Sequence, residues 1–80
     1  MRQFSIKVHS YAEIQAFVSL AIAQPFDVLI GNSSQSTNAK SLMGILALNF
    51  RRPLTVSVNC AEEDFLRFYR QAAPFIVASF

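Results

Sequence analysis

The stretch that decides the fold runs from Asn38 to Leu48 and reads NAKSLMGILAL. Its small polar residues end at Ser41, and serine is a preferred N-cap because its hydroxyl accepts a hydrogen bond from a free first-turn amide. Leu42, Ile45 and Leu46 follow at helical spacing. The pattern therefore predicts a short and almost wholly apolar helix that begins immediately after Ser41.

Residues 38–45 (NAKSLMGI) resemble the regulatory-serine segment of the HPr family, the small phosphocarriers of bacterial sugar phosphotransferase systems. The similarity continues through Leu48, and the spacing of the predicted elements on both sides fits the whole family domain. The resemblance implies that residues 1–80 form a single HPr-like domain. It also implies that Ser41 is a regulatory serine, phosphorylated by an HPr-kinase-like enzyme, although the serine could serve as a helix cap alone.

Along the rest of the chain, segments with apolar residues at every second position alternate with segments in which apolar residues have helical spacing. Residues 4–8 and 54–58 alternate apolar and polar side chains, which predicts strands, and residues 26–38 read as a hairpin. Helical spacing predicts a helix that begins with a Ser10–Glu13 capping box, and another that runs from Glu62 towards Pro74.

The predicted order is β-α-β-β-α-β-α. It favours an α+β fold in which a four-stranded antiparallel sheet is covered on one face by three helices. The resemblance implies the same architecture, because HPr proteins are open-faced β-sandwiches of four strands and three helices.

The composition narrows the class of protein. The seven basic residues are dispersed, so no clustered basic face for nucleic acid is expected, and no apolar run reaches the length of a membrane span. The single cysteine, Cys60, is expected to be a buried small residue in a cytoplasmic protein without a signal peptide. The sequence shows no Cys/His cluster, carboxylate pair or Gly-rich loop, so we expect no metal, cofactor or enzymatic activity.

The second signature of the HPr family, a Gly-Leu/Ile-His-Ala-Arg-Pro segment bearing the phosphorylated histidine, is missing. Counting back from Ser41 without gaps places Ser10 at the histidine position, Ala12 at the arginine and Glu13 at the proline. Serine cannot form the phosphoramidate that passes phosphate onward. The carboxylate of Glu13 would compete with phosphate for the amides at the start of the helix.

The only imidazole is that of His9, one position before Ser10. In one interpretation a shortened loop has moved the histidine, and His9 still accepts phosphate. In the other, His9 is the last, outward-facing residue of the first strand. His9 and Ser10 are therefore the residues nearest to the family's phosphorylated histidine.

Leu42, Met43 and Leu46 are the candidate partner-binding residues, because the family uses exposed apolar side chains of this helix to dock other proteins. Met43 and Leu46 are predicted to face outward. The apolar tail from Phe75 to Phe80 is predicted to pack on the domain or within a homodimer, and Arg51 with Arg52 to form a solvated turn.

The sequence leaves three hypotheses for the function of the protein. The first is a regulatory or protein-binding module that has lost histidine phosphocarrier activity, similar to the catabolite-repression HPr-like proteins, in which phosphate on Ser41 decides docking. Its partners would be a kinase, enzyme I or a transcription regulator, with no nucleic acid and no membrane. The second is a divergent phosphocarrier that accepts phosphate from enzyme I on His9. The third is a structural or dimerising domain in which neither residue is modified.

Overall fold

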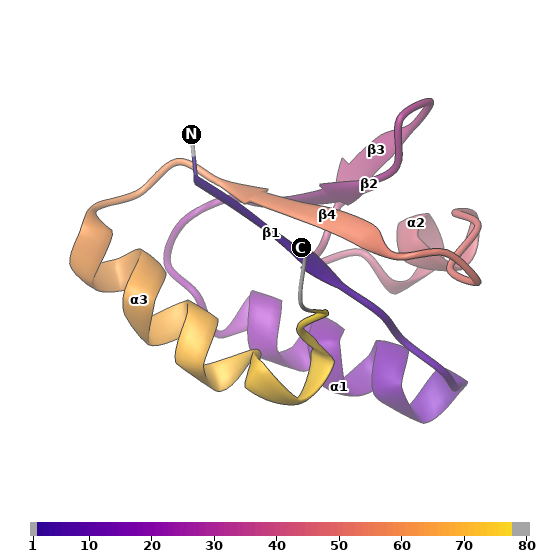
Figure 1. Cartoon of the computed structure of the whole chain (residues 1–80), viewed down its shortest axis with the longest axis horizontal. Helices are drawn as coiled ribbons and strands as arrows, with labels where there is room; N and C mark the ends of the chain where they lie inside the picture. Colours follow the sequence, from indigo (N-terminus) through magenta and orange to yellow (C-terminus); the bar gives the residue numbers. More distant parts are fainter. Residues whose placement is uncertain (1, 78–80) are drawn as a thin grey trace.

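The computed structural model describes residues 2–77 and contains four strands and three α-helices (Figure 1). In chain order these are β1 (Arg2–Ile6), α1 (Tyr11–Ile22), β2 (Val28–Gly31), β3 (Ser36–Asn38), α2 (Leu42–Leu46), β4 (Leu54–Val58) and α3 (Glu62–Gln71), followed by a 3-10 turn at Ala73–Phe75. The predicted β-α-β-β-α-β-α order and α+β class are confirmed.

The four strands form one antiparallel sheet in the order β1-β4-β2-β3. Val56 of β4 lies opposite Phe4 of β1 and opposite Ile30 of β2, so three apolar side chains form a row across the inner face. Helices α1 and α3 cover this face (Figure 1). The period-two alternation of the strands is thus explained by burial on one side only.

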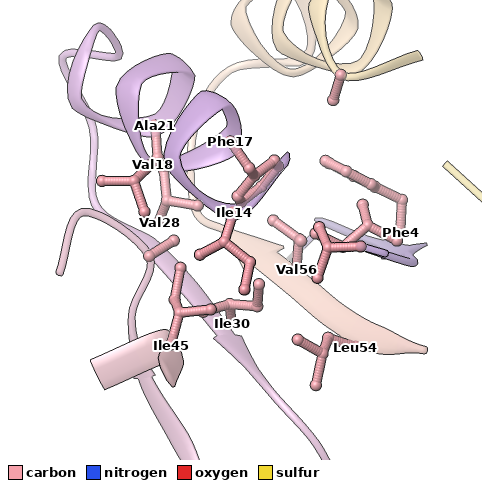
Figure 2. Packing of buried hydrophobic residues seen from close by; sticks show 14 of the residues in the cluster. Phe4, Ile14, Phe17, Val18, Ala21, Val28, Ile30, Ile45, Leu54 and Val56 are labelled. Atoms are coloured by element: carbon pink, nitrogen blue, oxygen red, sulfur yellow. The ribbon is translucent and has the colours of Figure 1, made fainter. Parts of the chain in front are cut away.

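The core lies between the sheet and the helices. Ile14 and Phe17 of α1 are buried and point towards Ile30 and Val56 of the sheet (Figure 2). Phe68 of α3 contacts the same core, with its ring centroid 6.2 Å from that of Phe17. Each such side chain contributes about 1.5–3 kcal/mol when it is fully buried. The helical stripes predicted from spacing are therefore the inner faces of α1 and α3.

The end of β1 differs from the prediction. One of the two interpretations made His9 the last residue of this strand, but β1 ends at Ile6, which lies opposite Leu54, the first residue of β4. Pairing stops there because the partner strand stops. His9 is exposed in the connection to α1.

Residues at the two ends of the described chain lie against each other. The amide of Lys7 donates to the carbonyl of Phe75 (2.8 Å), and the amide of Val77 donates to the carbonyl of Ser5 (3.0 Å). The ring of Phe75 packs edge-on against Phe17, with a centroid distance of 5.6 Å. The first half of the apolar tail therefore packs on the domain, and residues 78–80 lie outside the described residues.

Cys60 was expected to be buried, but it is only half-buried, because it lies in the short connection between β4 and α3. Its carbonyl accepts a hydrogen bond from Nε of Arg2 at 3.3 Å. Within residues 2–77, no helix is long and apolar enough to cross a membrane.

Candidate functional site

Ser41 is the N-cap of α2, as predicted. Its backbone is extended (φ −105°, ψ 109°), and its Oγ accepts a hydrogen bond from the amide of Gly44 at 3.1 Å. The amide of Ser41 in turn donates to the carbonyl of Asn38 at 2.9 Å. Ser41 as a residue is partly exposed, and its hydroxyl stabilises the start of the helix.

Two close contacts hold α2 in place. Ile45 is 1% exposed and lies beside Ile30 of β2 (Figure 2). On the neighbouring face of the helix, Gly44 lies so close to Thr37 of β3 that a Cβ there would overlap Oγ1 of the threonine. The glycine is therefore required by close packing, and the resulting position of α2 determines which of its side chains reach solvent.

The outer surface of α2 is apolar. Met43 is 78% exposed and Leu46 is 36% exposed, as predicted, whereas Leu42 is half-buried and packs against the core. Of the three candidate partner-binding residues, Met43 is largely exposed, Leu46 is partly exposed, and Leu42 forms the boundary with the core. A flexible methionine beside a leucine is a surface suited to protein contact.

The start of α1 is closed by its own side chains. The Oγ of Ser10 accepts from the amide of Glu13 (3.2 Å), and Oε1 of Glu13 accepts from the amide of His9 (3.1 Å). This is the predicted capping box, with the glutamate reaching one residue further back than the N-cap. A carboxylate therefore lies just before the start of α1, on the amide of His9, and its negative charge opposes a phosphate at this helix end.

Basic side chains lie on the segment before α1 and on a turn between α2 and β4. Nζ of Lys7 lies 3.5 Å from the carbonyl of Phe50, which brings this turn close to the end of β1. Arg51 and Arg52 follow Phe50 and are exposed, as predicted for a solvated turn. Figure 1 shows α2, this turn and the N-terminal end of α1 on the same side of the molecule.

A hollow of about 410 Å³ lies elsewhere, on the uncovered face of the sheet. It is lined by side chains and backbone of Gln3, Leu29, Ile30, Gly31, Asn32, Ser33, Ser36, Thr55 and Ser57. None of the candidate site residues named from the sequence lines this hollow. Within residues 2–77, no three His, Cys, Asp or Glu side chains gather in a way that could hold a metal ion.

Among solved structures that share this arrangement of strands and helices is an HPr protein. The crystal structure of HPr-C-His from Thermoanaerobacter tengcongensis aligns with 90% of this chain and 90% of its own, with a TM-score of 0.71 and 21% sequence identity. The chain has the HPr fold. No protein-family model and no curated protein matches the sequence. The β-α-β-β-α-β-α order that the sequence predicts is therefore the order of an HPr fold.

Proposed function

We propose that this HPr-fold chain is a regulatory, protein-binding module of the phosphotransferase or catabolite-control type, and that it does not carry phosphate on a histidine. The observation that carries the proposal is the contrast between its two helix starts. Ser41 is partly exposed and begins the helix that carries the apolar surface of Met43 and Leu46. At the start of α1, by contrast, Ser10 caps the amide of Glu13 and the carboxylate of Glu13 binds the amide of His9.

The regulatory step is phosphorylation of Ser41. A cytoplasmic kinase transfers the γ-phosphoryl group of ATP to Oγ, releasing ADP and the hydroxyl proton. The product carries a charge of about −1.5 to −2 at neutral pH. Because this charge lies one turn from Met43 and Leu46, it changes which protein can bury them. The partner is the kinase itself, enzyme I or a transcription regulator, and the chain is not an enzyme.

Loss of carrier activity follows from the chemistry at His9. A phosphorylated imidazole needs cations or free amides around its phosphate, but the His9 amide already binds Glu13. The like charge of that carboxylate opposes phosphate at the same place. We propose that His9 is a solvent-exposed surface residue.

The second candidate is the divergent carrier. One observation favours it: the contact between Lys7 and the carbonyl of Phe50 brings the turn bearing Arg51 and Arg52 near the end of β1. These arginines could supply the positive charge that Ala12 lacks. The dimerising alternative has less support, because Phe75 packs on Phe17 of its own domain.

The experiment is phosphorylation by a purified bacterial HPr kinase with ATP, read by intact mass. Wild type, Ser41→Ala and Ser10→Ala are compared, and Ser10 is the matched control because it is also a helix N-cap serine. We expect one acid-stable phosphate on wild type and on Ser10→Ala, and none on Ser41→Ala. An unlabelled wild type, or equal labelling of Ser41→Ala, would refute the proposal.

A further inference from the structure

A buried glutamine closes the C-terminal end of α1. Gln24 is 8% exposed, and its Nε2 donates to the carbonyl of Leu20 (3.0 Å) and to Oε1 of Gln71 in α3 (3.1 Å). The first bond caps one of the carbonyls that a helix end leaves without a partner. The second joins α1 to α3. Gln24 therefore holds together the ends of two helices that cover the sheet.

Lys40, the residue before Ser41, completes this network. Its Nζ donates to the backbone carbonyl of Gln24 at 3.0 Å. The backbone of Lys40 is held on both sides, because its own amide binds Oδ1 of Asn38 (2.9 Å) and the neighbouring Ala39 is fully buried. The last turn of α1 contains no basic residue, so Lys40 supplies the positive charge that a helix C-terminus favours.

Lys40 is the cation closest to Ser41 along the chain. It is the only charged residue between Asp27 and Arg51. A phosphate on Ser41 would therefore have Lys40 as its nearest cation along the chain. A hydrogen bond between an ammonium and a dianion is stronger than one between an ammonium and a carbonyl.

We propose that Lys40 is a positioning residue with two partners, the carbonyl of Gln24 in the unmodified protein and the phosphate once Ser41 is phosphorylated. This rests on the phosphorylation of Ser41 proposed above. When Lys40 turns to the phosphate, the end of α1 loses its cation and its link to the segment before α2. The charge on Ser41 is thereby transmitted to α1 and to the α1–α3 contact through Gln24.

The test places phosphoserine at position 41 by genetic encoding, so that no kinase is needed. Amide hydrogen exchange at the end of α1 is then measured by NMR, at the amides of Ala23 and Gln24, which donate to Ser19 and Ala21. We expect exchange about tenfold faster in the phosphorylated protein, the change that corresponds to losing one charge-assisted bond. The unmodified wild type is the reference.

Two variants make the test specific. In Lys40→Met exchange should already be faster without phosphate, and phosphoserine should add nothing. Lys7→Met is the matched control, because Lys7 also binds carbonyl oxygens, those of Val8 and Phe50. It should respond to phosphate as the wild type does. Unchanged exchange in phosphorylated wild type, or an equal response in Lys40→Met, would overturn the proposal. Failure of a kinase to label Ser41 would instead count against the proposed function alone.

Discussion

The position of α2 depends on the missing side chain of Gly44, and Gly44→Ala tests this dependence. A Cβ at this position would overlap Oγ1 of Thr37 and would lie 3.1 Å from its Cγ2 and 3.2 Å from its Cβ. Rotating the threonine side chain about its Cα–Cβ bond moves Oγ1 and Cγ2 but not Cβ, so the 3.2 Å contact with Cβ remains. The helix must therefore move away from β3, or the strand must yield.

The expected magnitude is a difference between two effects. Alanine is better than glycine inside a helix by about 1 kcal/mol. Overpacking of a well-packed contact costs about 1–3 kcal/mol. We expect a net loss of up to about 2 kcal/mol in the free energy of unfolding, measured by urea denaturation, with Tm lower by up to roughly 15 °C.

A double-mutant cycle with Thr37→Ala separates the overlap from other effects of the substitution. Thr37→Ala removes Oγ1 and Cγ2, so in that background Gly44→Ala should keep the helix-propensity gain of up to about 1 kcal/mol, with a coupling energy of about 1–3 kcal/mol. If Gly44→Ala destabilises both backgrounds equally, or stabilises the wild type, the close approach of α2 to β3 does not fix the helix.

Three further predictions concern α2 and the tail. Ser41→Ala should cost about 1 kcal/mol of stability in urea denaturation through loss of the cap, and an unchanged midpoint would contradict this. Ile45→Ala should lower the free energy of unfolding by about 2–5 kcal/mol. Met43→Ser should change it by no more than about 0.5 kcal/mol in the same assay. Similar losses for both variants would contradict the orientation of α2. Truncation after Pro74 should lower Tm by uncovering Phe17, and size-exclusion chromatography should show a monomer with and without the tail.

The order of elements could be predicted because each element carries its own period. Ile14, Phe17 and Val18 are spaced for one helical face, and all three are buried. The end of β1 could not be predicted in the same way. Val8 continues the alternation and is buried, yet the strand ends at Ile6. Ile6 pairs with Leu54, the first residue of the neighbouring strand β4. Strand ends are set by the partner strand, which a local pattern does not show.

In the candidate site, too, local interactions could be predicted from the sequence and long-range ones could not. Both caps were predictable, because Ser41 with Gly44 and Ser10 with Glu13 are three residues apart and interact within one turn. The bond from Lys40 to Gln24 joins residues 16 positions apart. This bond forms only because the packing of α1 against the segment before α2 brings the two residues together. Nothing in the local sequence predicts that they pair.

The most direct test of the central claim is to expose the wild-type protein to two phosphate donors and map the modified residue. One sample receives enzyme I with phosphoenolpyruvate, and the other receives HPr kinase with ATP. We predict no label in the first sample and one acid-stable phosphate on Ser41 in the second. Acid-labile phosphate on His9 in the first sample would contradict the account and make the protein a phosphocarrier.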